Sequence, residues 1–319
     1  MQQIFQTLCD WQSAGSAVTL AVVTKTWGSA PRRAGSLMAI AADGRFEGSV
    51  SGGCVEGDVI AEAGTLAQSV DGEKGGGSKK LSFTVSSKDA WQVGLACGGE
   101  IEITLVALPH AASGALQAVI KAIDERGAGI IGFDLATGAA IFGPGTMENA
   151  ATVDATTLRL RVQANRRMAI VGAVHIAQHL CPMAVAAGYD VTVIDPRAAF
   201  VENRAFDGAT TVTDWPDDYF SNNPLDHRSA LVTLTHDPKI DDAALMPALG
   251  GAAFYIGCLG SRKTHAARLG RLEKAGMSPE QLSRIHGPVG LNIGAKNPAE
   301  IAISILAQVT QALRQKNAA

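Results

Sequence analysis

Apolar strand-like runs alternate with helical segments through the second half of this chain, and this alternation constrains the fold more than any other sequence feature. The first run ends in Gly172, and Gly188 stands where the following helix is predicted to end. The strand and helix segments lie in turn at residues 168–172, 175–187, 191–195, 230–234, 241–248 and 252–256. Because strand–helix–strand units join parallel neighbours, the pattern predicts a Rossmann-like, doubly wound parallel sheet.

The first half lacks this regular alternation. Strands are predicted at residues 17–26, 36–42, 79–85 and 100–107, and helices at 2–14, 55–69 and 113–126. A chain of 319 residues is long enough for two domains, each with its own core. We therefore predict an α/β protein with a mixed α+β domain over residues 1–150, a polar linker over 151–166 and the parallel-sheet domain over 167–319.

Composition and charge exclude several classes of protein. The formal charge of −3 does not predict the basic stripe of a nucleic-acid-binding protein. The five cysteines are odd in number and widely spaced, which is typical of reduced thiols in the cytosol. The start of the chain does not resemble a signal peptide, and the uncharged residues 243–261 are broken by proline and glycine. We expect a cytoplasmic protein that binds neither nucleic acid nor a membrane.

The run from Gly48 to Gly57 places Cys54 in a glycine-rich turn before a predicted helix. Small residues such as Ser51, Gly52 and Gly53 let backbone N–H groups approach an anionic ligand closely. The positive end of the helix points at the same place and favours a thiolate. The alternative is a hairpin with a buried cysteine, but the pattern favours a loop that holds a negative group beside a reactive sulfur.

Two more loops of the first half have related chemistry. Cys97, Gly98 and Gly99 precede the strand at residues 100–106. Arg32 and Arg33 lie in a turn between two predicted strands, and arginine suits bidentate binding of phosphate or carboxylate. Three such loops in one part of the sequence favour an anion-binding site over three unrelated turns.

The dinucleotide-binding fingerprint of the second half is altered. Gly172 and Ala177 fit its first and third positions, and Asp195 at the end of the next strand is well placed for a ribose. Val174 stands where the backbone of a glycine should meet a pyrophosphate, and its β-branched side chain opposes that approach. The sequence therefore predicts the fold while placing NAD(P) binding in doubt.

The predicted start of another helix in the second half carries positive side chains, which is unusual at a helix N-terminus. Ser261 is a candidate N-cap, and Arg262, Lys263 and His265 follow in the first turn. Cations at a helix N-terminus oppose the helix dipole. Either this turn is a solvated basic helix start, or an anion or a partner offsets the repulsion.

Together these segments resemble the XdhC/CoxI family, the accessory proteins that mature molybdenum hydroxylases such as xanthine dehydrogenase. The matching amino-terminal motifs are Gly28-Ser-Ala-Pro-Arg-Arg, Gly48-Ser-Val-Ser-Gly-Gly-Cys-Val-Glu-Gly and Cys97-Gly-Gly. The carboxy-terminal ones are Gly260-Ser-Arg-Lys-Thr-His and Ile285-His-Gly-Pro-Val-Gly-Leu-Asn-Ile-Gly-Ala. The family's usual second-domain motif has glycine at the position of Val174. This departure puts a nucleotide-binding role of the second domain in particular doubt.

The resemblance implies a molybdenum cofactor chaperone rather than an enzyme. Such a protein binds the cofactor, as molybdopterin or its dinucleotide, protects it while a cysteine desulfurase supplies the sulfido ligand, and passes it to the apo-hydroxylase. A homodimer is expected. We expect Cys54 to contact or shield the metal, Cys97 to support it, and the arginines to hold phosphate or pterin oxygens. The candidate cofactor-binding residues are Arg32, Arg33, Ser51, Gly52, Gly53, Cys54, Glu56, Cys97, Gly98, Gly99, Arg262 and His265.

Two alternatives stay open at this point. An NAD(P)-dependent oxidoreductase would use the second domain for its cofactor and the first for its substrate, and Val174 argues against it. A scaffold that binds the desulfurase and the hydroxylase without touching cofactor would leave the Cys54 loop without a purpose.

Overall fold

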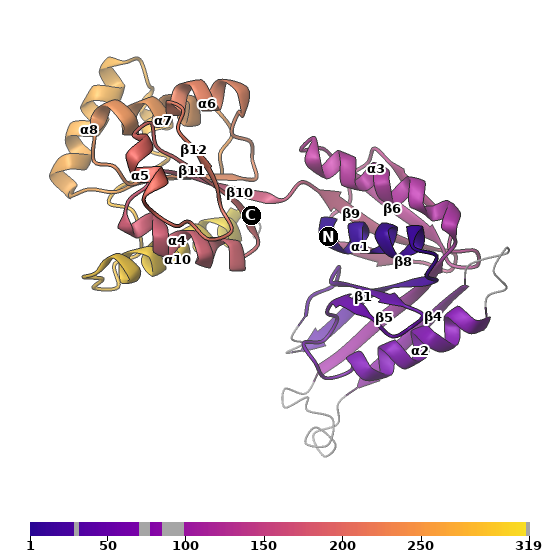
Figure 1. The fold of residues 1–319 in the computed structure, drawn as a ribbon. Helices are drawn as coiled ribbons and strands as arrows, with labels where there is room; N and C mark the ends of the chain where they lie inside the picture. The colour runs from indigo at the N-terminus through magenta and orange to yellow at the C-terminus, as the bar shows by residue number, and fades with distance from the viewer. Residues whose placement is uncertain (29–31, 70–76, 85–98, 317–319) are drawn as a thin grey trace. The chain divides into compact units, whose positions relative to one another are not determined.

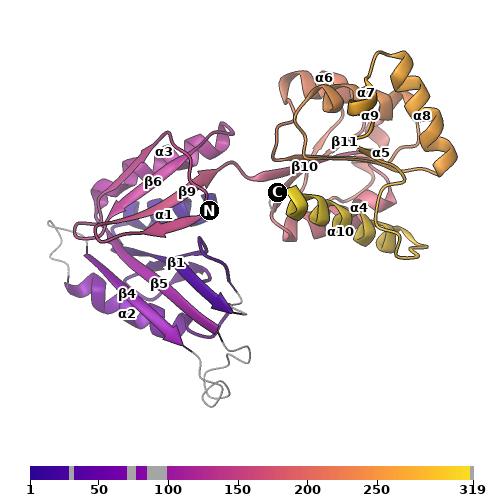
Figure 2. The same cartoon turned by 180° about the vertical axis from the view of Figure 1, so that it is seen from behind.

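A computed structural model gives the fold over residues 1–28, 32–69, 77–84 and 99–316. The chain divides into two compact units, Met1–Ala164 and Asn165–Ala319. Each unit has its own strands and helices, as Figures 1 and 2 show, and its own clusters of buried side chains. The two units are therefore described one after the other.

The first unit is built on a five-stranded antiparallel sheet with the strand order β3-β2-β1-β5-β4. Its strands are β1 (Val18–Gly28), β2 (Leu37–Ala41), β3 (Phe46–Gly48), β4 (Gly77–Thr84) and β5 (Gly99–Leu108). Helix α2 (Glu56–Ser69) packs on one face of this sheet. Helices α1 (Gln2–Ser13) and α3 (Ser113–Asp124) lie on the other, and the short 3₁₀ helix η1 (His110–Ala112) precedes α3.

A second, four-stranded sheet occupies the residues predicted to hold the end of the first domain and the linker. Its order is β7-β6-β9-β8, with β6 (Ala128–Asp134), β7 (Ala140–Gly143), β8 (Ala151–Val153) and β9 (Thr157–Gln163). The polar linker predicted over residues 151–166 is thus replaced by two strands and the start of a third. The reason is the alternation of Leu158, Leu160 and Val162, which point into the core between charged neighbours.

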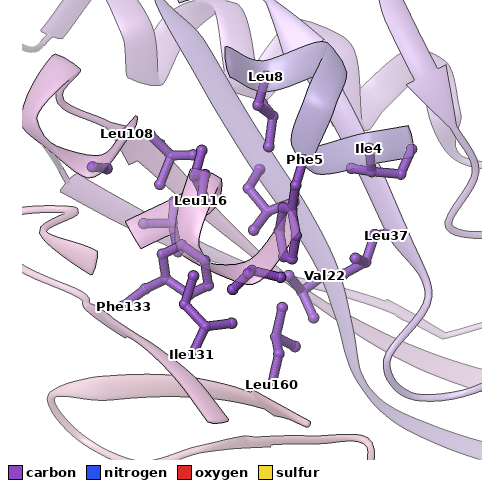
Figure 3. Close-up of a cluster of buried hydrophobic side chains, with 14 of the residues drawn as sticks. Ile4, Phe5, Leu8, Val22, Leu37, Leu108, Leu116, Ile131, Phe133 and Leu160 are labelled. Carbon is purple, nitrogen blue, oxygen red and sulfur yellow. The ribbon is translucent and has the colours of Figure 1, made fainter. Parts of the chain in front are cut away.

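The core of the first unit joins both sheets to the two helices. Figure 3 shows Phe5 and Leu8 of α1 against Leu116 of α3, with Ile131 and Leu160 of the second sheet beside them. Strand β1 is buried on both of its faces, because alternate residues enter this core and a second core beneath α2. Both faces of the main sheet are thereby covered. This leaves the loops at the ends of its strands as the places where a ligand could bind.

The second unit is a six-stranded parallel sheet with the order β12-β11-β10-β13-β14-β15, which confirms the predicted Rossmann-like fold. Its strands are β10 (Arg166–Val171), β11 (Tyr189–Ile194), β12 (Thr210–Val212), β13 (Ser229–Thr233), β14 (Tyr255–Cys258) and β15 (Ile285–His286). The order reverses between β10 and β13, where ligands of doubly wound sheets bind outside the carboxyl ends of the strands.

Helices cover both faces of the parallel sheet. On one face lie α4 (His175–Ala186) and α10 (Pro298–Lys316). On the other lie α6 (Pro216–Asn222), α7 (Pro238–Gly250), α8 (Arg262–Lys274) and α9 (Pro279–Leu282). The short α5 (Ala198–Glu202) follows β11. None of the helices in the described residues is long and apolar enough to cross a membrane.

Two elements of the second unit start three residues away from their predicted start. Helix α7 begins at Pro238 rather than at Asp241, because Asp237 caps it by accepting a hydrogen bond from the Lys239 amide at 3.0 Å. Strand β14 begins at Tyr255, three residues after the predicted start at residue 252. Strand β14 therefore pairs with β13 from Tyr255 to Cys258, directly before the glycine turn that follows it.

Candidate functional site

The sheet of the first unit brings its loops to one end. Val22 of β1 lies opposite Leu37 of β2, and the Ser49 amide after β3 donates to the Leu37 carbonyl at 3.2 Å. At the far tip of β1, Gly28 lies opposite Gly99 of β5. Because these strands are antiparallel neighbours, the segments after β1 and β3 and those before β2 and β5 all leave the same end of the sheet.

Two of the predicted arginines belong to this end. Arg32 and Arg33 are exposed in the turn before β2. The turn is fixed by the Gly35 amide, which donates to the Val23 carbonyl at 2.8 Å, and by the Ser36 hydroxyl, which donates to the Arg33 carbonyl at 2.8 Å. Cys97 and Gly98 lie outside the described residues, so their predicted role stays a prediction, while Gly99 begins β5 at the same sheet end.

The loop before α2 holds an anion that belongs to the chain itself. The side chain of Glu56, the first residue of α2, folds back into the loop and is only 8% exposed. Its Oε1 accepts hydrogen bonds from the Ser49 hydroxyl at 2.7 Å and from the amides of Val50, Ser51 and Gly52 at 3.2, 2.9 and 3.0 Å. Its Oε2 accepts from the Gly53 amide at 2.8 Å and from the Ser51 hydroxyl.

These donors decide the charge of Glu56. Burial alone would raise the pKa of this carboxyl, but the hydrogen bonds from the Ser51 hydroxyl, the Ser51 amide and the Ser49 hydroxyl outweigh burial. They lower the pKa of Glu56 from 4.5 to about 2, so the carboxylate is ionised at neutral pH. The loop amides that were predicted to approach an anionic ligand thus donate to Glu56, a side chain of the protein itself.

Cys54 lies between this loop and the core beneath α2. Its amide donates to the Ser51 hydroxyl at 3.0 Å, and its side chain is half-buried at the edge of the core that contains Val55. Gly52 and Gly53, with φ of 86° and 114°, adopt backbone conformations that favour glycine, which turns the loop amides inward. The thiol is therefore held at the sheet end that also carries the two arginines.

The second unit uses an internal carboxylate in the same way. Asp195, fully buried after β11, accepts the Ala173 amide from the turn after β10 at 2.8 Å. Arg197 donates to the same carboxylate through Nε at 2.8 Å and Nη2 at 2.7 Å. Burial would raise the pKa of Asp195, but the Arg197 and Ala173 hydrogen bonds lower it overall. The turn amide that a pyrophosphate would approach is therefore already bound.

Two arginine side chains near this turn stack on the ring of Phe200. The guanidinium carbons of Arg197 and Arg204 lie 4.0 and 4.6 Å from the centre of the Phe200 ring. Arg204 also donates to the Ala173 carbonyl at 2.6 Å. Sequence reasoning missed both arginines, although Arg197, two residues after Asp195, was a signal of charge at the carboxyl end of β11.

The start of α8 confirms the predicted cap and adds a buried cation. The Ser261 hydroxyl accepts the Thr264 amide at 3.1 Å, and Arg262 is exposed. His265 is half-buried, and burial lowers its pKa. Arg268, 1% exposed, lies one turn further along the helix. No sequence pattern singled out Arg268, since its position on the buried face of α8 is a property of the packed helix.

Arg268 faces an acid whose charge is disfavoured by burial. Its Nη2 donates to the Leu259 carbonyl at 3.0 Å and lies 3.4 Å from Asp241 Oδ2. Burial raises the pKa of Asp241 despite the Thr235 hydroxyl and Arg268. Arg268 and Asp241 belong to the second unit and Cys54 to the first, so each unit carries its own set of candidate residues. Within the described ranges, no group of three or more His, Cys, Asp or Glu side chains is arranged to hold a metal ion.

The fold and the two sets of residues define a class: an antiparallel-sheet unit with a cysteine-bearing glycine loop, followed by a Rossmann-like unit. Residues 168–309 match the XdhC Rossmann domain, and residues 11–73 match the XdhC and CoxI family. The chain belongs to the XdhC/CoxI family, as its motifs indicated.

Curated relatives align along most of the chain. A molybdenum cofactor insertion chaperone, PaoD of Escherichia coli, is 28% identical over 299 residues, covering 93% of this chain and 83% of the relative. A Bacillus subtilis protein named as a probable xanthine dehydrogenase subunit is 27% identical over 316 residues, covering 92% of each chain. A crystal structure from Bacillus halodurans described as a xanthine dehydrogenase has a TM-score of 0.76 at 24% identity, with 98% of this chain and 96% of that chain covered. That likeness shows the shared fold.

Proposed function

We propose that this protein carries the molybdenum cofactor, protects it while its terminal sulfido ligand is installed, and delivers it to a molybdenum hydroxylase of the xanthine dehydrogenase type. The observation that carries the proposal is Cys54, whose amide is hydrogen-bonded to Ser51 in a loop at the sheet end that also carries Arg32 and Arg33. The similarity to an insertion chaperone supports it. The cofactor is cargo in this proposal, so the protein itself need not catalyse turnover.

The residues of the first unit suit a cargo that combines a metal centre with anionic groups. The thiol of Cys54 would contact or shield the metal. The exposed guanidiniums of Arg32 and Arg33 would hold phosphate or pterin oxygens through charge-assisted hydrogen bonds. Cys97, Gly98 and Gly99 stay candidate contacts beside them, and Arg262 and His265 are candidate contacts in the second unit.

The proposed partners follow from the cargo. A cysteine desulfurase would supply sulfur while the cofactor is bound, and an apo-hydroxylase would receive it. A homodimer in the cytoplasm is the expected form of the carrier. The mononucleotide and dinucleotide forms of the cofactor share the phosphate that the arginines would bind.

Cofactor retention tests the proposal. Wild-type protein and Cys54→Ala protein are purified without oxygen after expression in cofactor-replete cells, and molybdenum and pterin are measured per chain. We expect the wild type to retain both and the Cys54→Ala variant to retain less. Cys9→Ala is the matched control, because Cys9 is a buried cysteine of α1 in the same unit and lies in the core that α1 shares with α3. Equal retention by all three proteins would remove Cys54 from the mechanism.

Cofactor retention combined with pull-downs separates the scaffold from the carrier, and the turn after β10 bears on the oxidoreductase. A scaffold for the desulfurase and the hydroxylase would bind both proteins in pull-downs while the purified wild type contained neither molybdenum nor pterin. A nicotinamide-dependent oxidoreductase would need the turn after β10, where Asp195 binds the Ala173 amide. Val174, the N-cap residue of α4, is half-buried at that turn and leaves less room than glycine.

A further inference from the structure

The buried carboxylate of Glu56 lies at the centre of the Cys54 loop, yet it has no room for a ligand of its own. It is 8% exposed, and the loop surrounds it with six donors. We infer that Glu56 is a positioning residue: it does not contact the cargo but fixes the loop that presents the Cys54 thiol. This inference deepens the proposed function, on which it rests, and corrects the expectation that Glu56 binds cofactor directly.

The hydrogen-bond capacity of the carboxylate is fully used. An ionised carboxylate offers about four lone-pair sites. Six donors converge on the two oxygens of Glu56: four consecutive amides, from Val50 to Gly53, and the hydroxyls of Ser49 and Ser51. Some sites must be shared between donors. A phosphate or pterin oxygen, itself an acceptor, gains nothing from Glu56 and would be repelled by its charge.

Ser51 carries the restraint from Glu56 to Cys54. A hydroxyl has one proton to donate and two lone pairs to accept with. The Ser51 hydroxyl donates to Glu56 Oε2 and accepts the amides of Cys54 and Val55, each at 3.0 Å. All three of its positions are used. The carboxylate therefore fixes the orientation of this hydroxyl, and the hydroxyl fixes the backbone of Cys54.

The core fixes the other side of the cysteine. Val55 is 4% exposed and packs with Val50 and Val59 in the core beneath α2. Cys54 thus stands between an amide bound to Ser51 and a neighbour anchored in the core. A thiol held in this way meets its ligand with little further loss of conformational freedom, which is the advantage of a preorganised site.

The test compares Glu56→Gln with Asp58→Asn. Both variants remove one negative charge from the first turn of α2, but the Asp58 side chain is exposed. Glutamine keeps the size of Glu56 and loses an acceptor oxygen, so the amides of residues 50–53 lose their charged partner. We expect hydrogen exchange of these amides to become at least about tenfold faster in Glu56→Gln, since hydrogen bonds to charged groups are the stronger ones. Asp58→Asn should exchange like the wild type.

Thiol reactivity reports on Cys54 without any cofactor. Peptide-resolved alkylation by iodoacetamide should be several-fold faster at Cys54 in Glu56→Gln than in wild type and Asp58→Asn, because the half-buried thiol is no longer held against the core. Ser51→Ala, which removes the relay but keeps the carboxylate, should also speed alkylation. It serves as the second variant if Glu56→Gln fails to fold. Unchanged exchange and unchanged alkylation in the folded variants would overturn the inference.

Cofactor retention then distinguishes this inference from the proposed function. If Glu56 positions Cys54, Glu56→Gln should lose cofactor together with amide protection. Loss of cofactor with unchanged amide exchange and alkylation would mean direct contact with the cargo, and would overturn the inference. Loss of amide protection with full cofactor retention would overturn it as well. If the wild type holds no cofactor, the proposed function fails, while exchange and alkylation still decide the role of Glu56.

Discussion

Single residues decide how the glycine-rich turns of this protein are used. Glu56 in the first unit and Asp195 in the second are buried carboxylates that accept backbone amides from such turns. A carboxylate and a phosphate oxygen compete for the same donors. An anion from outside is therefore expected at exposed guanidinium groups such as those of Arg32 and Arg33 rather than at the turn amides.

The lowered pKa of Glu56 gives a pH prediction. Because the pKa falls from 4.5 to about 2 on folding, Glu56 contributes its stability above pH 4.5 and loses it as the pH falls toward 2. At one pKa unit per 1.36 kcal/mol, the contribution is of order 3 kcal/mol. Thermal melts should therefore show wild type more stable than Glu56→Gln at pH 6, with the difference shrinking below pH 4.5. A difference that stayed constant down to pH 2 would contradict this assignment.

At the scale of elements, the packing of strand β9 decides whether the first unit includes the residues that were predicted to form a linker. Leu160 is fully buried and packs with Ile131 and Phe133 in the core shared by both sheets. Leu160→Ala should lower the free energy of unfolding by about 2–5 kcal/mol, as large-to-small changes in a core do. The matched control is Ile141→Ala on β7, whose side chain is 78% exposed and should change stability by no more than about 0.5 kcal/mol. Equal stability of the two variants in urea melts would restore the linker interpretation.

The elements that the sequence predicted are those with a strong period. The alternation of apolar runs and helices after residue 167 predicted the parallel sheet, since buried parallel strands are continuously apolar. Strand β6 was missed because its glycines, such as Gly129 and Gly132, are typical of loops. In the structure, Gly129 is needed because a Cβ there would lie 2.5 Å from the Gly143 carbonyl of the neighbouring strand. That close approach exists only once the strands have paired.

The candidate site was predicted in its parts but not in its contacts. The loop around Cys54 and the arginine turn were recognised from glycine, serine and arginine content, and sheet pairing brings them to one end. The sequence did not reveal that Glu56 binds the loop amides. A glutamate in the first turn of a helix is also expected on general grounds, because it interacts favourably with the helix dipole. Its reach back to Gly53 resembles the acid of a capping box, and this is the signal that was available.

At the scale of the whole molecule, the two units place their candidate residues at strand ends of sheets that are covered on both faces. In the Rossmann-like unit the turn after β10 lies at the carboxyl end of the sheet where the strand order reverses, and a nicotinamide cofactor would be expected to bind there. The Asp195 carboxylate instead accepts the Ala173 amide and both the amide and the guanidinium of Arg197. A ribose and a pyrophosphate would have to break this pair and its buried hydrogen bonds.

Binding of NAD⁺ or NADP⁺ can therefore be tested on the intact protein. A ligand present at 100 times its Kd would add about 2.7 kcal/mol to the stability of the state that binds it. We expect NAD⁺ and NADP⁺, titrated into the millimolar range, to leave the Tm unchanged in differential scanning fluorimetry, because Asp195 and Val174 oppose the dinucleotide at the turn after β10. The opposite result would be a Tm of the wild type that rises with the NAD⁺ or NADP⁺ concentration while the Tm of Asp195→Ala does not. It would show that the turn opens for a dinucleotide, and it would favour the oxidoreductase over the carrier.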